Sequence, residues 1–121
     1  MTVCWLQAAT YEEVAALDRR RAVAVVPLGA TEAHGPPLPP STDVIIVEAM
    51  ARAGAERLSQ QGATVLVLPT VALTPAPFAA AFPGTLSTRP ATLVALLEDV
   101  ADALAAQGFN RLVFISAHLD P

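Results

Sequence analysis

Three short runs rich in aliphatic and β-branched residues predict buried strands. They cover residues 22–28, 64–68 and 111–116, and the first two stop at Gly29 and Pro69. Apolar runs of this length are typical of parallel strands that are buried on both faces, because helices cover both sides of such a sheet. We therefore expect a parallel sheet of three strands.

Segments with helical spacing alternate with these runs. Thr10 and Glu13 form a capping-box pattern, which starts a helix that we expect to end near Arg20. A second helix is expected over residues 44–61, with Asp43 at its N-terminus. Its opening residues, 44–47, could instead form a strand, but the regular spacing of charged residues further along favours a helix.

The last helix is expected between Pro90 and Gly108, because proline suits the first turn of a helix and glycine commonly ends one. The face expected to enter the core has five aliphatic residues: Leu93, Leu96, Leu97, Val100 and Leu104. Residues 70–83, before this helix, form a long loop without periodicity. Loops of that length are usually functional or mobile.

The alternation of strands and helices predicts an α/β fold built on a βαβαβ unit, with right-handed crossovers between parallel strands. In such sheets ligands bind beyond the carboxyl ends of the strands. The segment after the first predicted strand carries Glu32, His34 and Asp43, and the last strand is followed by His118 and Asp120. We expect these five side chains at the same edge of the sheet.

Composition limits both the size and the partners of the protein. The length of 121 residues suits one domain, and the net charge of −4 with seven Lys and Arg residues leaves no basic stripe for a nucleic acid. The hydrophobic share of 54% and the mean hydropathy of +0.51 are high for a soluble domain of this size. Some apolar surface is therefore expected to be covered by another segment or subunit, and we expect a homo-oligomer.

Neither membrane insertion nor secretion is expected. Residues 65–82 form the longest weakly polar stretch, but Pro69, Pro75 and Pro77 interrupt it. The first residues lack the basic and apolar regions of a signal peptide, and the single cysteine, Cys4, cannot form an internal disulfide. We expect a cytoplasmic location.

The two histidines are the strongest candidates for chemistry, because both His34 and His118 follow the end of a predicted strand. Carboxylates in loops are most often solvated or cap a helix, and Asp43 has such a role available. Two imidazoles with three carboxylates form a mixed nitrogen and oxygen set that suits Zn²⁺, Mn²⁺ or Fe²⁺. The set is large enough for two ions if one carboxylate bridges them, and it indicates metal-assisted hydrolysis.

Several blocks of the sequence resemble those of the creatininase family of metal-dependent amidohydrolases. The first is Val-Pro-Leu-Gly-Ala-Thr-Glu-Ala-His-Gly-Pro at residues 26–36, followed by Thr42-Asp43. Phe-Pro-Gly-Thr at residues 82–85 and the stretch from Gly108 to His118 match further blocks in the same order. The resemblance covers nearly the whole chain and implies a three-layer α/β fold with a mainly parallel sheet. It also implies that residues 1–121 are the N-terminal portion of a single domain.

The resemblance further implies a centre of two divalent ions. Glu32 and His118 would bind one ion, His34 would bind the other, and Asp43 would bridge them. Asp120 stands where creatinine-hydrolysing members carry a glutamate ligand, and it is the candidate to complete the second site. Zn²⁺ is the expected metal, with Mn²⁺ or Fe²⁺ as alternatives.

The activity that the resemblance implies is hydrolysis of a non-peptide C–N bond in a cyclic amide, a formamide or a related small molecule. The histidine that often precedes Phe-Pro-Gly-Thr in the family is Ala81 here, which changes a substrate contact. The alternative function is that of a truncated, non-catalytic relative that serves as a metal-binding or assembly module.

Overall fold

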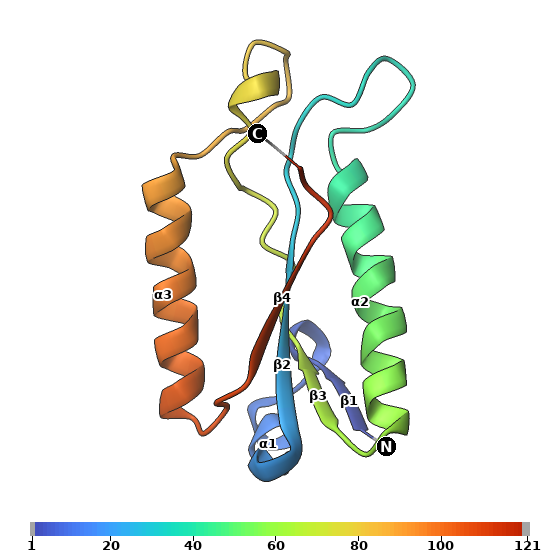
Figure 1. The fold of residues 1–121 in the computed structure, drawn as a ribbon, viewed down its shortest axis with the longest axis vertical. Helices are drawn as coiled ribbons and strands as arrows, with labels where there is room; N and C mark the ends of the chain where they lie inside the picture. The colour runs from blue at the N-terminus through green and yellow to red at the C-terminus, as the bar shows by residue number, and fades with distance from the viewer. Residues whose placement is uncertain (1, 120–121) are drawn as a thin grey trace.

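The structure is a computed structural model that describes residues 2–119. Within these residues, four parallel strands form a sheet in the order β1-β3-β2-β4: Thr2–Trp5 (β1), Ala22–Leu28 (β2), Thr64–Val67 (β3) and Leu112–Ser116 (β4). The helices are α1 (Tyr11–Ala15), α2 (Thr42–Gln60) and α3 (Pro90–Ala106), and short 3-10 turns occupy Leu6–Ala8 (η1), Arg19–Arg21 (η2) and Pro77–Ala79 (η3). The sheet lies between α2 and α3, which gives three layers (Figure 1). The expected α/β class is confirmed.

The strand β1 is an addition to the three expected strands. It pairs with β3 from Thr2 opposite Thr64 to Trp5 opposite Val67, and it extends the sheet on the side away from β4. Three of its four residues, Thr2, Val3 and Trp5, favour strands, but the segment is too short for a periodic pattern to be recognised.

The first helix is shorter than expected. The predicted capping box is present, because Thr10 Oγ1 accepts from the Glu13 N–H and the Glu13 carboxylate accepts from the Thr10 N–H. The helix nevertheless ends at Ala15 rather than near Arg20. The carboxylate of Asp18 accepts a hydrogen bond from the Arg20 backbone N–H, which begins a separate 3-10 turn instead of continuing the helix.

Alternate residues of the central strands enter two cores, one on each face of the sheet. The core on the α3 side includes Ala22, Ala24 and Leu66, together with Leu104 and Phe109. The core on the α2 side includes Val25, Val65 and Val67, together with Ala51 and Ala55. The two small helical residues let α2 pack closely against the strands.

The strand β4 is less buried than expected. It forms an edge of the sheet described by residues 2–119, and Val113 and Phe114 expose 43% and 47% of their surface. The nearby helix α3 is also half-covered, since Leu104 is buried but Leu96, expected on its core face, is exposed. These surfaces account for part of the high apolar content of the sequence. No helix within residues 2–119 has the length and apolar character needed to cross a membrane.

The order of the strands brings the ends of β2 and β4 together. The crossover through α2 leads from β2 to its neighbour β3, and the crossover through α3 returns the chain past β2 to β4. Leu28 at the end of β2 lies opposite Ser116 at the end of β4, so the two strands end level with each other. The segments that carry Glu32 and His118 therefore leave the sheet side by side.

Arg19 joins the end of α1 to the segment after α3. Its Nη1 donates to the carbonyl oxygens of Val14, Ala15 and Leu17 at 2.8, 3.0 and 2.8 Å, and its Nε donates to the carbonyl oxygen of Gln107 at 3.1 Å. Its guanidinium carbon lies 4.4 Å from the centre of the buried Phe109 ring.

We expect Arg19→Lys to lower the free energy of unfolding by about 1–3 kcal/mol, because lysine keeps the charge but not the planar set of donors. Urea denaturation measures this change. Arg20→Lys is the matched control, since the Arg20 side chain is 91% exposed, and its effect should stay within about 0.5 kcal/mol. Equal losses of stability in the two variants would contradict the role given to Arg19.

Candidate metal centre

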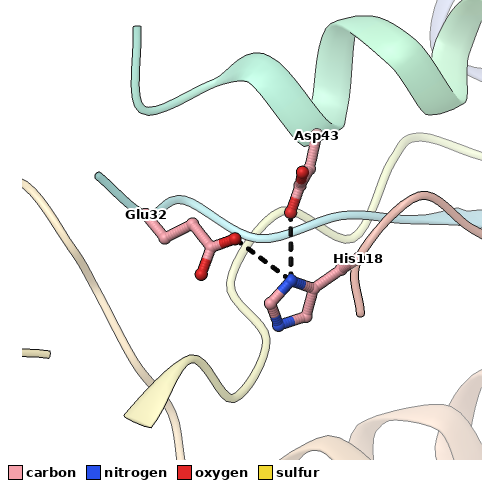
Figure 2. Close-up of side chains that lie close together, drawn as sticks. All are labelled: Glu32, Asp43 and His118. Carbon is pink, nitrogen blue, oxygen red and sulfur yellow. Dashed lines mark ion pairs between the residues drawn. The ribbon is translucent and has the colours of Figure 1, made fainter. Parts of the chain in front are cut away.

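Three side chains from distant parts of the chain meet beyond the carboxyl ends of β2 and β4 (Figure 2). Glu32 follows β2, Asp43 lies in the first turn of α2, and His118 follows β4. Nδ1 of His118 lies 3.2 Å from Glu32 Oε1 and 3.1 Å from Asp43 Oδ2. One candidate ligand atom from each of the three residues lies within 4.8 Å of the others.

His34 adds a second imidazole to this cluster. Its Nε2 lies 3.2 Å from Asp43 Oδ1, and its Nδ1 lies 3.4 Å from the carbonyl oxygen of Glu32. Asp43 therefore presents one carboxylate oxygen to each histidine. A carboxylate placed in this way can bridge two cations.

The cluster is largely withdrawn from water. The side chains of Asp43, His118 and Glu32 are 5%, 11% and 13% exposed, and that of His34 is 26% exposed. Burying two carboxylates close together is costly unless positive charge compensates them. Protonated imidazoles or a bound cation would provide that charge.

The backbone determines the tautomer of His118. Its Nε2 lies 2.8 Å from the carbonyl oxygen of Pro75, which can only accept a hydrogen bond, so Nε2 carries the proton. In the neutral ring Nδ1 then directs a lone pair toward two carboxylate oxygens. The lone pair and the carboxylate oxygens repel one another, and a cation among the three atoms would remove this repulsion. Metal-bound histidines commonly donate their second N–H to a backbone carbonyl in the same way.

The distances within the cluster fit a metal ion. Ligands that lie about 2.0–2.1 Å from a tetrahedral ion are about 3.3 Å from one another. The distances from His118 Nδ1 to the two carboxylates, 3.1 and 3.2 Å, are close to this spacing. Imidazole nitrogens with carboxylate oxygens are the ligands that Zn²⁺ and related transition metals bind. The residues present therefore fit the metal that the sequence analysis predicts.

Gly29 allows the first turn of α2 to reach the end of β2. A Cβ at residue 29 would lie 3.1 Å from both the carbonyl carbon of Asp43 and the backbone nitrogen of Val44. The Ala30 N–H, next along the chain, lies 3.4 Å from Asp43 Oδ2 and donates to it. The missing side chain at Gly29 therefore lets Asp43 lie buried beside the end of the strand.

The loop between β3 and α3 supports the same strand end. The Gly29 N–H donates to the Val71 carbonyl at 3.0 Å, and the buried Thr74 hydroxyl donates to the Gly29 carbonyl at 2.8 Å. This loop also provides the Pro75 carbonyl that holds His118. The length of this loop marks it in the sequence, but no local pattern singles out Thr74 or Pro75, because both contacts join residues far apart along the chain.

The structure brings together four of the five residues expected at this edge: Glu32, His34, Asp43 and His118. Asp120, the fifth, lies outside the described residues. The assignment of these residues as metal ligands remains a prediction.

We expect Gly29→Ala to destabilise the protein by about 1–3 kcal/mol, because the added methyl group must push the first turn of α2 away from β2. Any divalent metal that depends on Asp43 should bind more weakly in the same variant. Urea denaturation and zinc titration measure the two effects. Gly54→Ala is the control, since a Cβ at this helical position meets nothing within 4 Å. That variant should gain up to about 1 kcal/mol, and a similar gain in Gly29→Ala would show that the close approach does not matter.

Known proteins of one family match this chain in sequence. The family model Creatininase, described as creatinine amidohydrolase, matches residues 7–120. A mycofactocin precursor peptide peptidase from Mycobacterium tuberculosis is 35% identical over 99 residues, which cover 78% of this chain and 39% of that protein. The creatinine amidohydrolase of Pseudomonas putida is 31% identical over 103 residues, which cover 81% of this chain and 38% of the enzyme.

Solved structures of creatininase also match this chain. One crystal structure of creatinine amidohydrolase gives a TM-score of 0.80 at 29% identity, with 94% of this chain and 44% of that chain covered. A manganese creatininase gives a TM-score of 0.84 at 28% identity, with 97% and 46% covered. The chain spans less than half the length of these relatives. Sequence and structure agree that it belongs to the creatininase family.

Proposed function

We propose that this protein is a metal-dependent hydrolase that cleaves an amide C–N bond. The observation that carries the proposal is the position of His118, whose Nδ1 the Pro75 carbonyl directs toward the buried carboxylate of Asp43 and the largely buried carboxylate of Glu32. Zn²⁺ is the metal we expect, with Mn²⁺ or Fe²⁺ as alternatives. Solved creatininases include a manganese form and a form described as Zn-Zn type, which supports this choice.

Following the family resemblance, we divide the residues between two ions. Glu32 and His118 would hold the first ion, and His34 with Asp120 would hold the second. Asp43 would contribute one oxygen to each, since Oδ2 faces His118 and Oδ1 faces His34. Bound divalent ions would lower the pKa of a water molecule and polarise the carbonyl group of the substrate.

Other parts of the protein orient the proposed ligands and shield them from water. The Pro75 carbonyl keeps the proton on Nε2 of His118, so that Nδ1 stays available as a ligand. The burial of Asp43 at the start of α2 excludes water from the side of the site next to the strand. His34 is the most exposed of the four residues, so the open side of the site, where a substrate would enter, lies beside it.

A thiol nucleophile is a weaker candidate for the mechanism. The pKa of Cys4 is raised by its partial burial and, to a smaller extent, by the neighbouring Glu13 carboxylate. A raised pKa lowers the fraction of reactive thiolate. Cys4 also lies on β1, which is separated from β4 by two strands.

Two classes of substrate fit this proposal. A cyclic amide or formamide of a small molecule agrees with the name of the Pseudomonas putida relative, and a peptide amide agrees with the name of the peptidases. The peptidases are 35–37% identical to this chain, against 31% for creatinine amidohydrolase, so a peptide is retained as a candidate substrate beside the small amide. A hollow of about 480 Å³ lies between residues 33–36 and residues 78–83 and offers room for either substrate.

We also propose that the protein self-associates in the cytoplasm. The exposed apolar side chains of β4, Val113 and Phe114, support this proposal, since such residues are usually covered in a stable assembly. Light scattering on the purified chain tests it, and a monodisperse monomer would contradict it.

We expect the chain to bind two Zn²⁺ ions in calorimetric titrations. His118→Ala should remove the first binding event, His34→Ala should remove the second, and the double variant should bind neither ion. Binding should weaken as the pH falls, because protons compete with the metal for the same ligand atoms. Glu32→Gln should weaken binding of the first ion. Its matched control is Glu48→Gln, on the exposed side of α2, which should leave the binding of both ions unchanged. A double histidine variant that titrates like the parent would refute the metal site.

The activity itself is tested with creatinine, simple formamides and short peptides as substrates for the zinc-loaded protein. Turnover should disappear in Glu32→Gln and persist in Glu48→Gln. A chain that binds two ions but hydrolyses none of these substrates would favour the non-catalytic alternative.

A further inference from the structure

A hydroxyl group from a distant loop holds the backbone between two of the proposed ligands. Thr85 Oγ1 accepts a hydrogen bond from the Ala33 N–H at 2.9 Å. Ala33 is the single residue between Glu32 and His34. The bond therefore acts on the short segment that carries a ligand of each proposed ion.

Two other bonds to this segment join backbone groups, and the Thr31 hydroxyl beside it donates to the Ala72 carbonyl at 2.8 Å. The Glu32 N–H donates to the Pro40 carbonyl at 3.1 Å, and the Leu86 N–H donates to the Thr31 carbonyl at 2.9 Å. Such bonds do not depend on which side chain is present. The bond from Ala33 does, because its acceptor is the threonine hydroxyl.

A turn directs Thr85 toward Ala33. The Thr85 N–H donates to the Phe82 carbonyl at 3.2 Å, and Gly84 has a φ of +88°. Proline at the second position and glycine with positive φ at the third are typical of a type II turn. The Phe-Pro-Gly-Thr block at residues 82–85 is thereby given a physical role.

Among the proposed ligands, His34 depends most on the hydrogen bond from Ala33 to Thr85 for its position. Its side chain is 26% exposed, and its own contact with the Glu32 carbonyl is long at 3.4 Å. His118, in contrast, is held by the 2.8 Å contact with the Pro75 carbonyl. Apart from its 3.2 Å contact with Asp43 itself, His34 is therefore placed by the backbone at Ala33.

We propose that Thr85 is a positioning residue, which holds the Ala33 backbone and so places His34 opposite Asp43 to receive the second ion. The inference rests on the proposed two-ion function. Thr85 acts through Ala33 and is not itself a ligand. Its loss should affect the second ion more than the first.

Thr85→Val tests the proposal, because valine keeps the shape of threonine but cannot accept the hydrogen bond. In zinc titrations of the full chain, we expect the second ion to bind about tenfold more weakly. The first ion should bind within about threefold of the parent. Thr85→Ser should restore the second event, since serine keeps the hydroxyl.

Thr88→Val is the matched control, because it removes another threonine hydroxyl from the same loop. That hydroxyl donates to the Leu73 carbonyl at 3.2 Å. It should leave both binding events unchanged. A Thr85→Val variant that binds both ions like the parent would overturn the proposal. Equal weakening of both events, or a weakening that Thr85→Ser shares, would also overturn it.

A second measurement separates this inference from the two-ion function. In the metal-free protein, the ring nitrogen signals of His34 in NMR spectra should shift in Thr85→Val and stay in place in Thr88→Val. Unchanged His34 signals in Thr85→Val would overturn the positioning role. A parent chain that binds no second ion while these signals do shift would overturn the two-ion function alone.

Discussion

Two largely buried carboxylates face the same imidazole nitrogen, and the rest of the structure must hold these negative charges close together. Glu32 and Asp43 lie 3.2 and 3.1 Å from Nδ1 of His118, and both side chains are mostly withdrawn from water. A cation at the centre of this arrangement would offset the cost of holding the two carboxylates together away from water. To create the arrangement, the fold brings the ends of β2 and β4 level and places the first turn of α2 against Gly29.

The loop between β3 and α3 supplies no proposed ligand, yet it does much of the positioning. Pro75 orients His118, Thr74 holds the carbonyl of Gly29, and Thr85 holds the N–H of Ala33. The contacts of Thr74 and Thr85 satisfy backbone polar groups that the irregular segment after β2 does not pair within itself. Residues 70–88 therefore act as a frame for the site.

The sheet and the edge that carries the site are predictable because their signals are local. The apolar runs of β2, β3 and β4 mark parallel strands, and both histidines stand just past strand ends, so topology alone places them together. The division of ligands between two ions comes only from resemblance to the family. Local patterns fail where distant contacts decide the outcome. The strand β1 exists through its pairing with β3, and the length of α1 depends on a hydrogen bond of Asp18.

The partial exposure of β4 is another feature that local patterns do not predict, because the sequence of a strand does not reveal whether it has one neighbour or two. Residues 111–116 have the composition of a fully buried strand, but β4 pairs only with β2 within the described chain. The supporting roles of Pro75 and Thr85 are also not predictable from local sequence patterns. One acts through its backbone, and the other acts across a long separation in sequence.

The place of His118 just past an edge strand has a consequence for cohesion. An ion shared by Glu32 and His118 would tie the end of β4 to the end of the central strand β2, and it would close a loop that includes most of the chain. A ligand that binds only the folded state at a hundred times its Kd adds about 2.7 kcal/mol of stability. The cation would then fasten an edge strand to the centre of the sheet, so that loading with metal and tightening of the sheet are one process.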